Sequence, residues 1–119
     1  ANAVEAAEQC ERLTVPTIAE PEKFDALFEN WPADRKIMFC DETLSGEPAH
    51  SALAKAGKKA SNEPWAILIG PEGGFDDIER EAIIAHPNTT VVALGPRVLR
   101  ADTAAMAAIS LWQSALGDW

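Results

Sequence analysis

Short apolar runs alternate with amphipathic stretches along most of the chain. The segments 36–40, 65–69 and 90–94 are dominated by apolar residues, which predicts three strands. The second segment reads WAILI and lies between Pro64 and Gly70. A continuous apolar run of this kind is typical of a strand buried on both faces of a parallel sheet. We therefore expect these strands to form the buried centre of the fold.

A helix is predicted after the second strand and another after the third. Residues 76–86 begin with Asp76 and Glu79 at the spacing of a capping box, and an apolar stripe follows at Ile78, Ala82 and Ile83. Residues 102–116 form the closing helix, with an N-cap at Asp102 or Thr103. Strand, loop and helix thus occur twice in succession. This order predicts an α/β fold with right-handed crossovers and a mostly parallel sheet flanked by helices on both faces.

The remaining stretches carry weaker patterns. Residues 4–13 predict a helix that Pro16 ends, and residues 21–31 predict an amphipathic helix with Pro21 in its first turn. The segment 43–62 is rich in Ala, Ser, Gly and Lys, and is predicted to be a surface connection with one helix around 50–56. The first helix starts abruptly, so we expect the chain to be a part of something longer.

Composition narrows the class of protein. The chain has 119 residues, of which 47% are hydrophobic and 24% charged, values that are ordinary for one globular domain. The apolar runs are far shorter than the ~20 residues that span a bilayer, and the first residues lack the basic region of a secretory signal. Cys10 and Cys40 do not have the spacing of a zinc site. We expect a soluble, cytoplasmic protein without a metal, in which both cysteines are reduced and buried.

The chain is acidic overall, and cationic side chains are scarce after Lys59. A net charge of −9 argues against this chain binding nucleic acid by itself, because phosphate contacts need a basic surface. After Lys59 the only cationic side chains are those of Arg80, Arg97 and Arg100, and the last two share one short loop. Isolated arginines in an acidic half of a chain are predicted to serve a local purpose.

The loop after the second strand is the first candidate for chemistry. It reads Gly70-Pro71-Glu72-Gly73-Gly74, and its paired glycines allow positive φ and let a ligand approach the main chain closely. It lacks the Lys-Ser/Thr of a phosphate-binding P-loop and does not match GxGxxG. An ordinary strand-to-helix turn is the alternative. A carboxylate at Glu72, however, needs hydrogen bonds or a cation, for which Arg97 and Arg100 are the candidates.

The loop after the third strand is the second candidate. It runs from Leu94 to Thr103 and alternates apolar residues with two arginines. Either arginine can simply pair with a neighbouring carboxylate, at Glu72, Asp41 or Asp102. The other interpretation is that one guanidinium faces a substrate anion or a developing negative charge. Ligands of open parallel sheets bind where strand ends meet, so both loops are expected at one site.

Together these two segments carry a resemblance to a known family. ILIGPEGGF with the acidic helix start, followed by ALGPRVLRADTAA, resembles the two signature segments of the ribosomal RNA small subunit methyltransferase E (RsmE) family, within the SPOUT superfamily of knotted methyltransferases. The opening EAAEQCERLTVPTI is similar to the helix that precedes the central strands of the same family. The resemblance covers most of the chain.

The resemblance implies a function and a fold. The function is transfer of a methyl group from S-adenosyl-L-methionine to N3 of a uridine in 16S ribosomal RNA, by a cytoplasmic homodimer. The fold is a SPOUT-type α/β knot, with a deep trefoil knot near the carboxyl terminus. The cofactor would lie in the knot against main-chain groups and apolar side chains, contacting Ile69, Gly70, Pro71, Gly73 and Gly74 on one wall and Leu94, Gly95, Val98, Leu99 and Thr103 on the other.

The same resemblance suggests roles for three side chains. Loss of the proton from uridine N3 places negative charge on the flanking carbonyl oxygens, and Arg100 is expected to stabilise it, with Arg97 in reserve. Glu72 is a candidate proton acceptor, although a role in loop structure is the stronger expectation. His50 and His86 are expected to be structural.

The chain departs from the family pattern in three places. Asp76 and Asp102 stand where the family usually has Ser and Glu, and both retain the ability to cap a helix. The third departure is that the basic amino-terminal RNA-binding domain and the first strands are absent from this sequence. Residues 1–119 are therefore expected to be the carboxyl-terminal part of the methyltransferase domain. RNA binding is expected to depend mainly on the amino-terminal domain. A non-catalytic nucleotide-binding module and a dimerisation scaffold are the alternatives.

Overall fold

The computed structural model describes residues 2–60 and 62–119. The chain divides into two units, one up to Asn30 and one from Trp31 onward. The fold predicted for the strands and for the two loops concerns the second unit, which also contains every residue of the candidate site.

The first unit contains two short helices, α1 (Asn2–Gln9) and α2 (Phe24–Glu29). The prediction that the first helix continues to residue 13 was wrong, because Glu11 adopts a positive φ of 55° and ends it. Pro21 likewise lies ahead of α2 rather than in its first turn, since Lys23 is the N-cap. The Cys10 thiol is exposed, which corrects the expectation that it is buried.

The second unit is built on a four-stranded sheet with the order β2-β4-β1-β3, in which every pair is parallel. The strands are β1 (Lys36–Cys40), β2 (Glu47–Pro48), β3 (Trp65–Ile69) and β4 (Thr89–Ala93). The three predicted strands are confirmed, the last of them one residue earlier than expected, whereas β2 was not predicted. The mostly parallel α/β class is confirmed.

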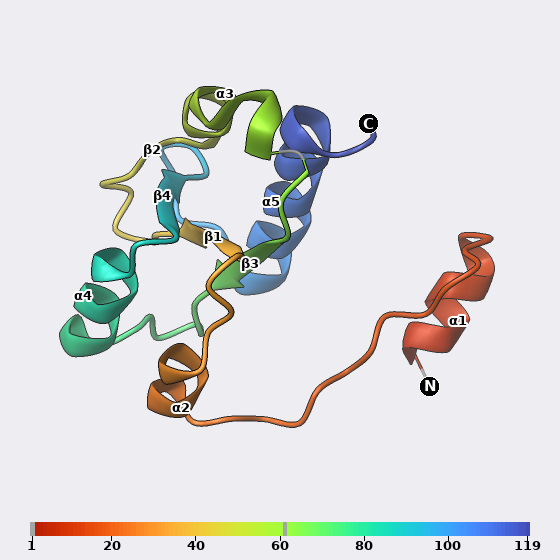
Figure 1. The fold of residues 1–119 in the computed structure, drawn as a ribbon, viewed down its shortest axis with the longest axis horizontal. Coiled ribbons are helices and arrows are strands. Elements are labelled where there is room, and N and C mark those ends of the chain that lie inside the picture. The colour runs from red at the N-terminus through yellow and green to blue at the C-terminus, as the bar shows by residue number, and fades with distance from the viewer. Residues whose placement is uncertain (1, 61) are drawn as a thin grey trace. The chain divides into compact units, whose positions relative to one another are not determined.

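Three helices flank this sheet. They are α3 (Ala49–Ala60), α4 (Asp77–Ala85) and α5 (Ala101–Leu116). The helices α3 and α5 lie together on one side of the sheet, and α4 lies on the other (Figure 1). Helices on both faces satisfy the burial requirement of a parallel sheet.

The core lies mainly between the sheet and the pair α3 and α5. Met38 of the central strand β1 packs there with Leu53, Val92, Ala108 and Leu116. Ile37 and Phe39 are also buried and point to the opposite face, because successive side chains of a strand alternate. The segment 43–62 is therefore no surface connection, because its helix supplies the core residues Ala52 and Leu53. Gly57 has a positive φ of 72° and interrupts α3, so the regular first part of the helix ends close to the predicted residue 56. Ser61 lies outside the described residues.

Two further expectations need correction. β3 is half-buried rather than buried on both faces, because in the described sheet it pairs on one side only, with β1. The predicted N-cap of α5 at Asp102 or Thr103 was also wrong. Arg100 holds the N-cap position without a side-chain hydrogen bond, and the Asp102 carboxylate accepts from the Thr103 N–H inside the first turn, at 2.9 Å.

The start of α4 follows the prediction closely. The Asp76 carboxylate accepts from the Glu79 N–H at 2.7 Å, and the Glu79 carboxylate accepts from the Asp76 N–H at 3.1 Å. This reciprocal pair is the predicted capping box. Of the predicted apolar stripe only Ile83 is fully buried, whereas Ile78 is 81% exposed. The capping box fixes where α4 begins, and thereby where each of its side chains lies relative to the sheet.

Candidate functional site

The carboxyl ends of β1, β3 and β4 meet at one edge of the sheet, because all three strands run in parallel. A cavity of about 530 Å³ lies at this edge. The segments after the three strands line it, together with the start of α5. The lining residues are Phe39, Cys40, Asp41, Glu42, Leu44, Ile69, Gly70, Pro71, Glu72, Phe75, Leu94, Arg97, Val98, Leu99, Arg100, Ala101 and Ala104.

The sequence prediction that the two loops share one cavity is therefore confirmed. Most of the predicted contact residues line it: Ile69, Gly70, Pro71, Glu72, Leu94, Arg97, Val98, Leu99 and Arg100. Four others lie in the same loops but outside the lining, namely Gly73, Gly74, Gly95 and Thr103. The assignment of cofactor contacts and catalytic roles to these residues remains a prediction.

The glycine loop owes its shape to a tight turn. The Gly74 N–H donates to the Pro71 carbonyl at 2.8 Å, and Gly74 itself adopts a φ of 77°. A Cβ on Gly74 would overlap the carboxylate of Glu42, whereas a Cβ on Gly73 would meet no atom within 4 Å. Gly73 therefore has space around it for a side chain. At Gly74, by contrast, both the positive φ and the neighbouring Glu42 side chain require a glycine.

Phe75 closes the base of the same loop. A Cβ on Gly70 would lie 3.2 Å from the Phe75 ring, so the absence of a side chain at Gly70 lets the ring approach the end of β3. The Phe75 ring in turn meets Phe39 of β1 edge-on, with ring centroids 6.0 Å apart. These aromatic residues give the cavity an apolar floor between β1 and β3.

The arginine loop presents its cations to solvent. Arg97 is exposed, and the side chain of Arg100 is 80% exposed. Arg100 lies 3.8 Å from Asp102, a long contact between two exposed groups that contributes little to stability. Within residues 2–60 and 62–119 Glu72 has no ion pair or side-chain hydrogen bond, so the predicted pairing of Glu72 with either arginine was wrong. The guanidinium groups of this loop can therefore reach a bound anion.

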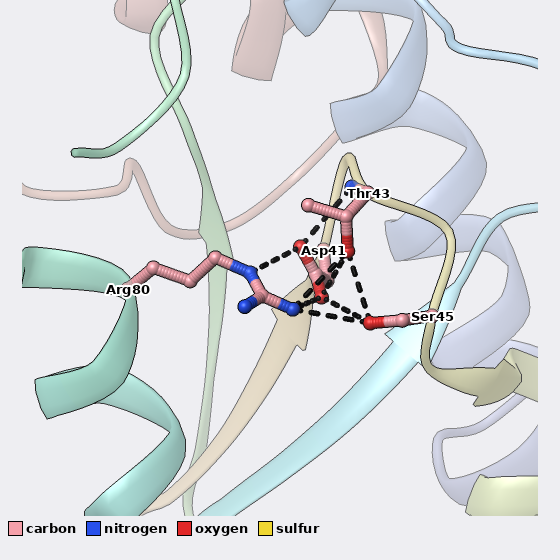
Figure 2. Close-up of polar contacts among 4 residues, drawn as sticks. All are labelled: Asp41, Thr43, Ser45 and Arg80. Carbon is pink, nitrogen blue, oxygen red and sulfur yellow. Dashed lines mark hydrogen bonds and ion pairs between the residues drawn. The ribbon is translucent and has the colours of Figure 1, made fainter. Parts of the chain in front are cut away.

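The third wall of the cavity follows β1 and was not assigned to the site from the sequence. Its signal was the acidic pair Asp41 and Glu42, which directly follows an apolar strand. Asp41 is only 2% exposed and accepts two hydrogen bonds from Arg80 of α4 (Figure 2). Arg80 is therefore the partner of Asp41. Of the pairings considered for Arg97 and Arg100, the one with Asp41 was wrong, whereas the contact of Arg100 with Asp102 is present.

This environment shifts two pKa values. Burial alone would raise the pKa of Asp41, but hydrogen bonds from Arg80, Thr43 and Ser45 outweigh it and lower that pKa from 3.8 to about 2. The hydrogen bond to Asp41 raises the pKa of Arg80. The neighbouring Cys40 has no such donors, and burial raises the pKa of its thiol to about 12. At neutral pH this wall thus holds an ionised carboxylate beside a protonated thiol.

Other kinds of site find no support in the part of the chain that the structure describes. It contains no group of three or more His, Cys, Asp or Glu residues placed to hold a metal ion. None of its helices is both long and apolar enough to cross a bilayer.

Fold and cavity together define an α/β domain with a ligand-sized cavity at the carboxyl edge of a parallel sheet. A family model described as RNA methyltransferase domain matches residues 1–113. The chain belongs to this family, and the resemblance drawn from its two loop sequences is confirmed.

Individual relatives agree with this assignment. The ribosomal RNA small subunit methyltransferase E of Rickettsia conorii is 35% identical over 108 residues, which cover 90% of this chain and 42% of that protein. The protein of the same name from Bacillus subtilis is 36% identical over 111 residues, which cover 91% of this chain and 42% of that protein. The chain thus spans less than half the length of these curated relatives.

Solved structures show the same fold. A putative methyltransferase from Legionella pneumophila, in complex with S-adenosylmethionine, superimposes with a TM-score of 0.76 at 30% identity, covering 95% of this chain and 43% of that one. The ribosomal RNA small subunit methyltransferase E of Neisseria gonorrhoeae, bound to S-adenosyl methionine, gives a TM-score of 0.78 at 24% identity, covering 98% of this chain and 46% of that one. The second likeness, at this lower identity, concerns the fold alone.

Proposed function

We propose that this chain supplies the cofactor cavity of an S-adenosyl-L-methionine-dependent enzyme that methylates N3 of a uridine in 16S ribosomal RNA. The observation that carries the proposal is the single cavity at the strand ends, lined by both loops that carry the family resemblance. Membership in the RNA methyltransferase domain family supports it independently of the cavity.

The cavity suits this cofactor in size and chemistry. A volume of about 530 Å³ lies within the range of about 300–1,000 Å³ typical of small-molecule sites. Ile69, Leu94 and Leu99 offer apolar surface for the adenine ring. Cationic and acidic side chains line the same cavity, which suits a ligand that carries both charges. When bound, the cofactor supplies an electrophilic methyl group.

The chain's own task is to align the reactants and stabilise charge. Proton loss from uridine N3 develops negative charge on the adjacent carbonyl oxygens. We assign Arg100, whose exposed guanidinium belongs to a residue that lines the cavity, the role of offsetting this charge. Arg97 of the same loop is the second candidate. Glu72 lines the cavity without a partner among the described residues, so its carboxylate is available to accept the proton.

The proposal extends to assembly and topology. α5 exposes Met106 and Ile109, which are 64% and 50% exposed and lie about one turn apart. We propose that this face contributes to a homodimer, that the chain forms the trefoil knot of the SPOUT superfamily, and that the enzyme acts in the cytoplasm. Binding to the small ribosomal subunit is assigned mainly to an amino-terminal RNA-binding domain outside this sequence, since the net charge here is −9.

Cofactor binding is tested by calorimetric titration of the protein with S-adenosyl-L-methionine, S-adenosylhomocysteine and ATP. We expect saturable binding of the first two compounds and no binding of ATP. Binding of ATP alone would instead indicate a nucleotide-binding module, and binding of none of the three would remove the proposed role of the cavity.

The role of Arg100 is tested by Arg100→Ala in the full-length enzyme. We expect turnover on 16S ribosomal RNA to fall about 100-fold or more, as when one oxyanion-stabilising donor is removed, while cofactor affinity changes less than threefold. The matched control is Arg35→Ala, because Arg35 is exposed and does not line the cavity. Turnover of Arg100→Ala equal to that of the control would exclude Arg100 from the mechanism.

A further inference from the structure

A buried ion pair links the segment after β1, which lines the cavity, to the helix α4, which does not. Arg80 of α4 donates through Nε to Asp41 Oδ1 at 3.2 Å and through Nη2 to Asp41 Oδ2 at 2.7 Å. The side chain of Asp41 is fully buried, and that of Arg80 is 27% exposed. The guanidinium therefore engages both carboxylate oxygens, the strongest arrangement available to this pair of residues.

Two hydroxyl groups complete the cluster. The Thr43 hydroxyl donates to Asp41 Oδ2 at 2.8 Å and the Ser45 hydroxyl donates to the same oxygen at 3.0 Å. Arg80 Nη2 also lies 3.1 Å from each of these hydroxyl oxygens. Figure 2 shows how one guanidinium reaches three side chains of the segment that follows β1. The segment 41–45 is thus fastened to α4 at several points.

The fastened segment is a wall of the cavity. Asp41, Glu42 and Leu44 all line it, whereas Arg80 does not. Any influence of Arg80 on a ligand must therefore pass through the segment 41–45. A surface ion pair would exert little control over a loop, but loss of one partner from a buried pair leaves an uncompensated charge that drives rearrangement toward water.

We propose that Arg80 is a positioning residue that holds the segment 41–45 in place as a wall of the cofactor cavity. The part of this inference that concerns the cofactor rests on the proposed function. The part that concerns the wall rests on the geometry of the cluster and is tested without a ligand.

Cys40 provides a local probe for the wall. Cys40 is one of the residues that line the cavity, immediately precedes Asp41, and is half-buried. We would measure its alkylation by iodoacetamide at pH 8 in a Cys10→Ser background, which removes the exposed thiol. The variants are Arg80→Met, which removes the guanidinium, and Arg80→Lys, which keeps the charge but not the two-point contact.

We expect alkylation of Cys40 to be at least about tenfold faster in Arg80→Met than in the parent, because a displaced wall hydrates the thiol and raises its thiolate fraction. Arg80→Lys should show a smaller increase. The matched control is Lys55→Met, which breaks the exposed ion pair between Lys55 and Glu47. Alkylation of the control should match the parent within about twofold.

The affinity for S-adenosyl-L-methionine is then measured by calorimetry in the same variants, with circular dichroism confirming the fold. We expect Arg80→Met to lose at least about tenfold in affinity and Arg80→Lys to lose less. A rate of Cys40 alkylation in folded Arg80→Lys and Arg80→Met equal to that of Lys55→Met would overturn the inference. If Arg80→Met does not fold, the comparison of Arg80→Lys with Lys55→Met decides.

The two proposals fail in different ways. If Cys40 becomes reactive in the Arg80 variants and the parent binds no S-adenosyl-L-methionine, the proposed function is wrong and the positioning role stands. If the parent binds the cofactor, Cys40 reactivity rises and affinity does not change, the wall moves without contributing to binding. That result would overturn the part of the inference that concerns the cofactor.

Discussion

Replacement of Gly74 by alanine tests two reasons for a glycine in the loop after β3: the left-handed backbone and the lack of space for a Cβ. Gly74 has a φ of 77°, and a Cβ there would overlap the Glu42 carboxylate. Gly95, in the other loop, has a φ of 96° and no atom within 4 Å of a Cβ. Gly73 has neither a left-handed φ nor a neighbour within that distance. These glycines therefore form a graded series.

The structure sets the expected magnitudes. Left-handed backbone at alanine costs roughly 1–2 kcal/mol, and this strain applies to Gly74→Ala and Gly95→Ala alike. Glu42 is exposed and flexible, so it can move away from a new Cβ at the expense of a poorer rotamer, about 0.5–1.5 kcal/mol. We expect a destabilisation of about 2–3 kcal/mol for Gly74→Ala and about 1–2 kcal/mol for Gly95→Ala. Gly73→Ala should stay within about 0.5 kcal/mol of the parent.

The assay is urea unfolding at pH 7, from which the free energy of unfolding and the slope m are obtained for each variant. A double variant, Glu42→Ala with Gly74→Ala, completes a cycle that isolates the steric contribution. In the Glu42→Ala background the loss caused by Gly74→Ala should fall to that of Gly95→Ala. Equal stability of Gly74→Ala and Gly73→Ala would refute the assignment of the left-handed turn, and a cycle without coupling would refute the contact with Glu42.

Further predictions concern the ion pair, the capping box and the thiols. The pKa of Asp41 is lowered in the folded state, so its contribution to stability is complete above about pH 4 and is lost as pH falls through about 2. The difference in unfolding free energy between the parent and Asp41→Asn should shrink over that range, and a constant difference would contradict the shift. Asp76→Ala should lower the free energy of unfolding by about 1 kcal/mol in urea titrations, while the exposed Glu81→Ala should change it by less than about 0.5 kcal/mol. At pH 8, Ellman's reagent should modify Cys10 first and Cys40 much more slowly, because burial holds the Cys40 pKa near 12; equal rates would contradict that burial.

Three strands of the sheet were predictable because they are short, mainly apolar runs with little helical periodicity. The run Trp65–Ile69 and its glycine-rich exit also located one wall of the cavity, since parallel strands all end at the same edge. Capping residues fixed the start of α4 through local contacts over three positions. Such features depend on neighbours in sequence, which is why a single chain reveals them.

Burial was harder to predict, because it depends on which elements are neighbours in space. WAILI looks like a central strand, yet the observed order places β4 and β1 at the centre and β3 at the edge of the described sheet. β2 has only two residues, too few for a periodic signal. The contribution of α3 to the core was underestimated for a related reason: among the side chains of this helix that the structure describes, the buried ones are those of Ala49, Ala52 and Leu53.

The position of the acidic wall after β1 could have been predicted from the sequence. Parallel strands end at one edge, so Asp41 and Glu42 were bound to lie beside the two loops already assigned to the cavity. The choice of partner for Asp41 is another matter. Arg97 and Arg100 belong to a loop of the predicted site and were therefore the expected partners. Arg80 reaches Asp41 instead, because the capping box starts α4 at Asp77 and the buried Ile83 anchors that helix to the sheet. Local signals could thus have placed the carboxylate at the cavity, whereas tertiary packing selected its cation.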